Sequence, residues 1–155
     1  MLRAAIQPYD NFEISTLEVD KATPSWTVET LAYFAEQLPD ETLCLLMGSD
    51  AFRQINEWYE WHTLLDYAHM VVVTRAGVPM DLSDEVAGFL DCHRVESLPE
   101  PIADAQGNIL LLQTDVPRVS STQVRHAIEA GEALDRLLPE SVEQLIRTNS
   151  YYGYQ

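Results

Sequence analysis

The chain is poor in residues that several classes of protein require. Its 155 residues include one lysine, two cysteines and six glycines. The cysteines, Cys44 and Cys92, stand far apart, which argues against a disulfide framework or a paired-cysteine metal site and indicates reduced thiols. No apolar run approaches the ~20 residues that span a bilayer, and the start, MLRAAIQPYD, lacks the apolar stretch of roughly 7–15 residues of a signal peptide. We therefore expect a cytoplasmic protein.

Positive charge is also scarce. Nine Lys and Arg stand against 25 Asp and Glu, so the formal net charge is -16. A field of this sign repels nucleic acid and anionic membranes, and we expect neither as a partner. A small phosphate ligand stays compatible with this charge, because it needs only a local positive site. Hydrophobic residues make up 46% of the chain, which favours a folded domain over a disordered or collagen-like chain.

The hydrophobic pattern alternates between the period of strands and the period of helices. Continuous apolar runs predict buried strands at 42–47 and 69–75, and further strands are expected at 12–19, 92–98 and 108–114, with a turn at 104–108. The helices expected from the pattern are 2–6, 27–38, a short one from 49 to about 56, 62–68, 83–90, 120–131 and 139–146. With no repeat or linker, this alternation predicts one domain, 1–155, with a parallel α/β sheet. Ligands of such sheets bind beyond the carboxyl ends of the strands.

The segment SSTQVR, residues 120–125, opens one of the expected helices. A helix start offers free backbone N–H groups and a partial positive charge, so it accepts phosphate. Ser121 and Thr122 add hydroxyl donors, and Arg125 lies on the same face four residues after Ser121. The segment is therefore either a phosphate site or an ordinary helix cap followed by a surface arginine.

Two further motifs join a strand or a loop to a helix. In MGSD, after the strand at 42–47, Gly48 permits close backbone approach and Asp50 can accept two ribose hydroxyls. In PSWT, Trp26 and Thr27 open a helix whose N–H groups can hold a carboxylate. Taken alone, each motif favours a plain cap of the helix that follows it.

The aromatic cluster Trp58, Tyr59 and Trp61 either packs in the core or stacks on a flat heterocycle. The histidines carry less information, because no two of them have the spacing of metal ligands. They are His62, His69, His93 and His126. The sequence contains no G-x-S-x-G, Walker or G-x-G-x-x-G pattern, which disfavours a serine hydrolase, a P-loop protein and the usual dinucleotide fingerprint.

The order of the motifs PSWTVETL, LLMGSDAF, WYEWHTLL, VVVTRAG, VSSTQVR and LLPESVEQLI closely resembles the bacterial nicotinate-nucleotide adenylyltransferase family. The similarity runs from about Leu2 to the end of the chain. It implies a doubly wound, Rossmann-like nucleotidyltransferase fold of the H-x-G-H superfamily. It also implies that ATP and nicotinate mononucleotide give deamido-NAD and pyrophosphate, with Mg²⁺ bound through the ATP phosphates.

The resemblance implies a role for each of nine residues. ATP would be bound by Gly48, Asp50, Ser121, Thr122 and Arg125. The nicotinate nucleotide would be bound by Trp26, Thr27, Trp58 and Arg75. Trp26 departs from the family, which has tyrosine at this position, so contacts made through that hydroxyl are in question.

A larger departure lies at the front, because the sequence contains no H-x-G-H motif, whose histidines act on the ATP phosphates in the family. Residues 1–6 resemble the latter part of the helix that follows this motif. We expect the chain to lack the first strand, the catalytic loop and half of the first helix. A misplaced start, a natural truncation and a degenerate paralogue all fit this pattern.

Without its central first strand the sheet is expected to have a gap with two unpaired strand edges, which favours self-association. We expect the chain alone to be inactive. Two other functions stay open: a non-catalytic nucleotide-binding or interaction module derived from the family, and a relative that uses nicotinamide mononucleotide as acceptor.

Overall fold

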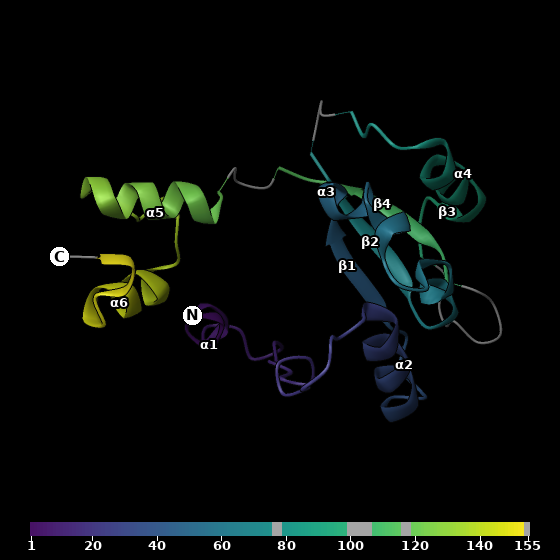
Figure 1. Cartoon of the computed structure of the whole chain (residues 1–155), viewed down its shortest axis with the longest axis horizontal. Helices are drawn as coiled ribbons and strands as arrows, with labels where there is room; N and C mark the ends of the chain where they lie inside the picture. The colour runs from purple at the N-terminus through teal and green to yellow at the C-terminus, as the bar shows by residue number, and fades with distance from the viewer. Residues whose placement is uncertain (76–78, 99–106, 116–118, 154–155) are drawn as a thin grey trace. The chain divides into compact units, whose positions relative to one another are not determined.

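The computed structural model describes residues 1–75, 79–98, 107–115 and 119–153, which form two compact units (Figure 1). Unit 1 comprises Met1–Thr16 and Pro117–Gln155, and unit 2 comprises Leu17–Val116. Each unit has an apolar core of its own. The single domain expected from the sequence stays a prediction.

Unit 2 contains a parallel sheet of four strands in the order β1-β2-β4-β3. The strands are β1 (Cys44–Gly48), β2 (His69–Thr74), β3 (Arg94–Val95) and β4 (Ile109–Gln113). The expected strands at 42–47, 69–75 and 108–114 are therefore confirmed, to within two residues at their ends. Because every pairing is parallel, the carboxyl ends of the strands meet at one edge of the sheet.

The prediction of a strand at 12–19 is wrong. Residues 12–16 are irregular and residues 17–19 form a turn, and the side chain of Val19 is 83% exposed. Alternation of apolar and polar residues describes a strand only when a neighbouring strand accepts its hydrogen bonds, and none of the described strands pairs with this segment. The segment 92–98 forms a strand at Arg94–Val95 alone, because helix continues to His93. In the turn expected at 104–108, residues 104–106 lie outside the described residues.

The prediction of a buried strand at 42–47 is wrong for one face of β1. Along β1, Met47 is buried whereas Leu46 is 65% exposed. The core of unit 2 lies against the face that carries Met47, Met70 and Val72, and the face of Leu46 has no comparable cover among the described residues. The expected gap in the middle of the sheet is absent from the described strands, which are contiguous. β1 is the outermost strand on one side of the sheet, so its outer hydrogen-bonding groups have no partner strand among the described residues. Self-association through this strand stays a prediction.

Among the described residues of unit 2, five helical segments pack around this core. They are α2 (Thr27–Gln37), α3 (Ser49–Phe52), the 3-10 helices η1 (Ile55–Glu57) and η2 (Trp61–Asp66), and α4 (Asp84–His93). The helix expected at 62–68 is therefore a 3-10 helix that begins at Trp61. The hydroxyl of Ser83 accepts the Val86 N–H at 3.4 Å, which confirms the predicted cap of α4.

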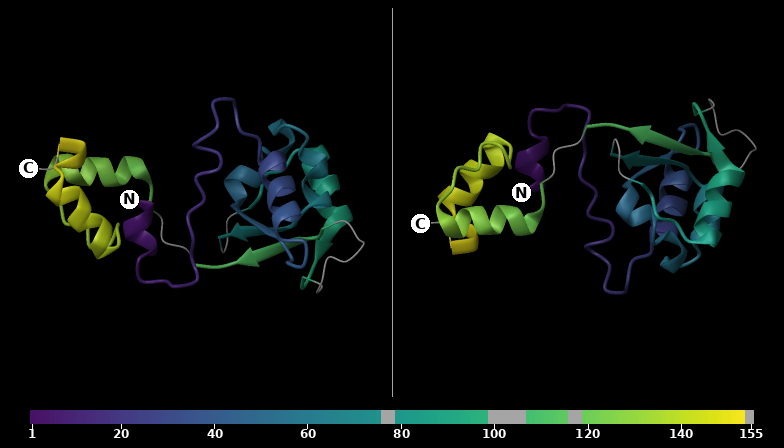
Figure 2. Two further views of the ribbon diagram at one scale, coloured as in Figure 1. Left: turned by 90° about the horizontal axis from the view of Figure 1, so that it is seen from below. Right: turned by 90° about the horizontal axis from the view of Figure 1, so that it is seen from above.

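Unit 1 is helical, and Figure 2 shows its helices gathered side by side. They are α1 (Leu2–Ile6), α5 (Ser121–Ala130), α6 (Glu140–Thr148) and η3 (Tyr151–Gly153). The apolar faces of α5 and α6 form the core, and the Ser141 hydroxyl ties α6 to α1 by donating to the Ala4 carbonyl at 2.7 Å. Gly131 ends α5 with a φ of 66°, the left-handed conformation for which glycine is preferred. In the described part of the chain, no helix has the length and apolar character that a membrane span requires.

Gly107 precedes β4 and passes unusually close to the loop before β2. A Cβ at this position would overlap the carbonyl oxygen of Ala68, which is main chain and has little freedom to move. The Gly107 N–H donates to the Leu65 carbonyl at 2.6 Å. The absence of a side chain here therefore lets the start of β4 dock against the end of η2.

Replacing Gly107 and Gly88 with alanine should have opposite effects on the stability of unit 2. We expect Gly107→Ala to cost about 1–3 kcal/mol, because the added methyl group forces a shift of main chain. Gly88 lies inside α4 with no described atom within 4 Å of an added Cβ, so Gly88→Ala should stabilise by about 0.5–1 kcal/mol. Urea unfolding measures both. Equal stability of the two variants would contradict the close approach at Gly107.

Candidate functional site

Polar residues follow β1 and β2 at the edge of the sheet where these strands end. β1 ends at Gly48, the N-cap of α3, and Asp50 lies exposed in the first turn of that helix. β2 ends at Thr74 and is followed by the exposed Arg75. The parallel register pairs Gly48 with Val73, so these residues belong to one edge. The edge thus offers a carboxylate, which accepts hydroxyl hydrogen bonds, and a guanidinium, which binds phosphate.

Space around Gly48 is open. No described atom lies within 4 Å of the Cβ that another residue would carry there, and its φ of -79° is accessible to any residue. Packing within the described residues therefore does not require glycine at this position. The open space is what close approach of a ligand to the main chain would need.

The start of α5 in unit 1 carries the second group of predicted residues. The Ser120 hydroxyl caps the helix by accepting the Gln123 N–H at 3.1 Å. Arg125 reaches back along the helix, and its Nη2 donates to the Thr122 hydroxyl at 3.4 Å. Ser121 and Arg125 line one hollow of about 220 Å³, whose other walls are mostly apolar. The predicted side chains thus gather at the helix start, where the backbone N–H groups favour an anion.

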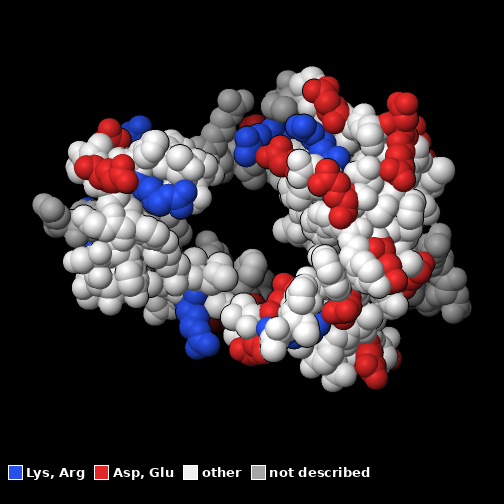
Figure 3. Space-filling model, in the orientation of Figure 1, with Lys and Arg blue, Asp and Glu red and all other residues white. Residues whose placement is uncertain are grey.

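Charge is unevenly divided between the units. Unit 2 carries 18 of the 25 acidic residues and four of the nine basic ones, and Figure 3 shows red side chains spread over its surface. Unit 1 has seven acidic and five basic residues and is nearly neutral. An anion at α5 therefore meets less like charge within its own unit than an anion at the sheet edge of unit 2. The six predicted residues in unit 2 and the three in unit 1 form separate groups.

Two exposed aromatic rings meet beside the start of α2. Trp26 is the N-cap of α2, and its ring centroid lies 5.1 Å from that of Tyr59, with the ring planes 34° apart. The side chains are 42% and 49% exposed. Thr27, the first residue of α2, is half-buried, and Trp58 packs against the core of unit 2 while part of it stays exposed. Sequence spacing had grouped Tyr59 with Trp58 and Trp61 and held no signal for its contact with Trp26.

Glu60, next to Tyr59, was also missed as a candidate. Its φ of 48° and ψ of 38° are left-handed, which is uncommon for a residue other than glycine. Its carbonyl accepts the Thr63 hydroxyl at 2.8 Å and the Thr63 N–H at 3.0 Å, which hold the turn in place. Interaction of the Tyr59 hydroxyl with the Glu60 carboxylate, and then the charge of Glu29, raise the pKa of Tyr59.

The histidines are not gathered into a site. His69 is buried in β2, where its Nδ1 accepts the Asn108 N–H at 2.8 Å, so it holds the start of β4 against β2. Over the described ranges, no three His, Cys, Asp or Glu side chains come together as metal ligands.

Parallel α/β sheets bind their ligands beyond the carboxyl ends of the strands, which is where Asp50 and Arg75 lie. The Cytidylyltransferase-like family model matches residues 1–127. The fold resembles that of the solved nicotinic acid mononucleotide adenylyltransferase of Plasmodium falciparum complexed with APC, with a TM-score of 0.61 at 13% identity over 86% of this chain. The chain spans 61% of the length of that structure. The predicted Rossmann-like nucleotidyltransferase fold is confirmed.

Curated relatives define the family more closely. A probable nicotinate-nucleotide adenylyltransferase of Aeromonas hydrophila is 38% identical over 151 residues, which are 97% of this chain and 70% of that protein. One from Hydrogenovibrio crunogenus is 35% identical over 152 residues, 98% of this chain and 71% of that protein. The chain belongs to the nicotinate-nucleotide adenylyltransferase family, as its motifs predicted.

Glu60→Gln should lower the pKa of Tyr59. The variant removes the negative charge that stabilises the neutral phenol, so the phenolate should form at lower pH than in the wild type. Absorbance at the phenolate band, titrated in the wild type and in Tyr59→Phe, isolates the Tyr59 step by difference. Glu57→Gln, which removes the charge of an exposed residue of η1, is the control. Titration of Tyr59 at the same pH in Glu60→Gln and in the wild type would contradict the contact.

Proposed function

We propose that this chain belongs to an enzyme that joins ATP and nicotinate mononucleotide to give deamido-NAD and pyrophosphate. The observation that carries the proposal is its match to relatives of that name over 97% of its length at 38% identity. The gathering of Ser121, Thr122 and Arg125 at one helix start supports it independently, because this reaction requires a site for phosphates.

The reaction is a direct phosphoryl-type transfer. A phosphate oxygen of nicotinate mononucleotide attacks the α-phosphorus of ATP and forms the new P–O bond. The bond between the α-phosphorus and the bridging oxygen breaks, and pyrophosphate leaves with its electron pair. No covalent intermediate with the protein forms. Catalysis of this kind rests on positioning the two nucleotides and on neutralising the charge of the phosphates.

Each unit carries residues that we propose as contacts for ATP. Arg125 and the N–H groups at the start of α5 hold the triphosphate, with Ser121 and Thr122 as hydroxyl donors. Gly48 lets the adenosine approach the main chain, and the Asp50 carboxylate accepts the ribose hydroxyls. The open space at Gly48 and the exposure of Asp50 support this assignment.

The nicotinate nucleotide is bound by unit 2. N–H groups at the start of α2, at Trp26 and Thr27, receive the nicotinate carboxylate, which a helix start favours over a neutral amide. Trp58 stacks on the pyridine ring with the part of its side chain that is exposed. Arg75, at the carboxyl end of β2, neutralises the phosphate of this nucleotide.

Mg²⁺ enters this proposal with ATP, coordinated by the phosphates. The described residues fit that arrangement, because they offer exposed hydroxyl and guanidinium donors for phosphate oxygens and no cluster of carboxylates for a metal. When bound, Mg²⁺ supplies neutralisation of phosphate charge. Because the proposed reaction consumes ATP, we also propose that the protein acts in the cytoplasm.

Removal of Arg125 should weaken phosphate binding. A charge-assisted hydrogen bond contributes about 1.5–3 kcal/mol, so we expect Arg125→Ala to raise the Kd for ATP or pyrophosphate about 10- to 150-fold. Arg136→Ala is the matched control, because Arg136 is an exposed arginine of unit 1 that does not line the hollow. Isothermal titration calorimetry measures both. Affinities of the two variants within twofold of each other would contradict the assignment.

Trp58→Ala should weaken binding of nicotinate mononucleotide far more than binding of ATP. Stacking of a ring on an aromatic side chain contributes about 1–3 kcal/mol. Trp58→Phe, which keeps a ring against the core, should retain most of the affinity. Calorimetric titration of each variant with each nucleotide makes the comparison. Equal loss for both nucleotides would mean that Trp58 serves only to pack the core.

The 155-residue polypeptide should form no measurable deamido-NAD. The sequence contains no H-x-G-H motif and therefore lacks the pair of histidines that the motif provides. Removal of a single side chain that stabilises the charge of a transition state lowers the rate about 10²–10³-fold. Binding of both nucleotides without turnover would favour the nucleotide-binding module as the function of this polypeptide. Chromatographic detection of deamido-NAD after incubation with both nucleotides and Mg²⁺ is the measurement, and robust turnover would show that the pair is dispensable.

A further inference from the structure

The contact between Trp26 and Tyr59 joins two segments that are distant in the sequence. Trp26 caps α2, while Tyr59 lies in the loop between η1 and η2. This loop also carries Trp58, so the contact links the start of a helix to the immediate neighbour of the proposed stacking residue. Both rings are about half exposed, and the contact therefore contributes little to the apolar core.

The direction of the Tyr59 ring is set by anchors on both sides of it. On one side, Trp58 packs against the core. On the other side, Glu60 adopts the left-handed conformation, and Trp61 is buried at the start of η2, which itself packs against α2. A left-handed residue other than glycine costs free energy, and such strain is concentrated at ligand clamps and active sites. The short loop is thereby held so that Tyr59 projects toward Trp26.

We propose that Tyr59 is a positioning residue, which holds Trp26 and the start of α2 at a fixed separation from Trp58. The inference rests on the proposed function, in which the α2 start receives the nicotinate carboxylate and Trp58 receives the pyridine ring. Two parts of one binding site that are held together in advance bind with a smaller loss of conformational entropy. The contact therefore acts on the affinity for the nicotinate nucleotide and leaves that for ATP unchanged.

The ring of Tyr59, rather than its hydroxyl, makes this contact. The observed contact is between the two rings, whose centroids lie 5.1 Å apart. A phenylalanine at this position keeps the ring and should keep the function. Alanine removes it.

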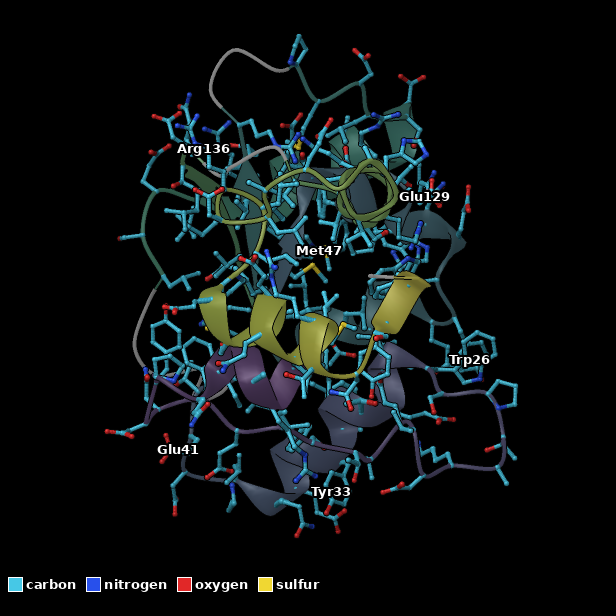
Figure 4. The ribbon with its side chains drawn as sticks, turned by 90° about the vertical axis from the view of Figure 1, so that its left-hand side faces the viewer. Trp26, Tyr33, Glu41, Met47, Glu129 and Arg136 are labelled. Carbon is cyan, nitrogen blue, oxygen red and sulfur yellow. The ribbon has the colours of Figure 1, made fainter. Side chains whose placement is uncertain are left out.

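The experiment compares three single variants of the 155-residue polypeptide by calorimetric titration with nicotinate mononucleotide and, separately, with ATP. We expect Tyr59→Ala to raise the Kd for nicotinate mononucleotide roughly 3- to 10-fold, the range for loss of an aromatic pair, with the Kd for ATP unchanged. Tyr59→Phe should bind both nucleotides as the wild type does. Tyr33→Ala is the matched control, because Tyr33 is an exposed tyrosine of α2 whose ring partner is Phe34, and Figure 4 shows it well apart from Trp26.

Two further measurements separate positioning from general stability. In Tyr59→Ala, amide hydrogen exchange should accelerate at Glu29 and Thr30, whose N–H groups donate to the Trp26 carbonyl, while staying unchanged in β2. Combining Trp26→Ala with Tyr59→Ala should weaken nicotinate mononucleotide binding by less than the sum of the two single losses in free energy, because both variants break one contact.

The outcomes that overturn the inference are distinct from those that overturn the proposed function. Unchanged binding by Tyr59→Ala, equal loss for both nucleotides, or failure of Tyr59→Phe to retain affinity each overturns the positioning role. A wild-type polypeptide that binds ATP but not nicotinate mononucleotide overturns the proposed function, and the inference with it, before any variant is compared.

Discussion

Parallel pairing of β1, β2 and β4 is the constraint on which the rest of unit 2 depends. Parallel strands place all their carboxyl ends at one edge, so the segments that follow β1 and β2 bring Asp50 and Arg75 to the same side of the sheet. The same register turns Met47, Met70 and Val72 toward the helices, which form the core on that face. The position of the polar edge and the position of the core thus follow from a single set of backbone hydrogen bonds.

A net charge of -16 repels the phosphates of a nucleotide. A nucleotide therefore binds such a chain only where the attraction of nearby N–H and guanidinium groups exceeds this repulsion. The two units offer such donors in different ways. Unit 1 is nearly neutral, and its Arg125 stands at the start of a helix whose free N–H groups add partial positive charge. Unit 2 is strongly acidic, and in the proposed function the start of α2 and the side chain of Arg75 attract the anion there.

Irregular backbone supplies the aromatic part of the candidate site. The loop between η1 and η2 holds Trp58 against the core and directs Tyr59 outward, through a left-handed residue at Glu60. A regular helix over these residues would have placed neighbouring side chains about 100° apart around its axis. The 3-10 geometry and the left-handed turn instead allow adjacent aromatic residues to serve the core and the surface.

The sequence by itself determined the features that depend on neighbours a few residues away: the helices at 27–37 and 121–130, the caps at Ser83, Ser120 and Gly131, and the three main strands. The order of its motifs also identified the family. The tertiary structure alone decided three things. Residues 12–19 form no strand, because a strand needs a neighbouring strand to accept its hydrogen bonds. Leu46 is exposed, because its burial depends on which elements pack against that face of the sheet. Trp26 contacts Tyr59 because folding brings together two segments that no periodic sequence pattern connects.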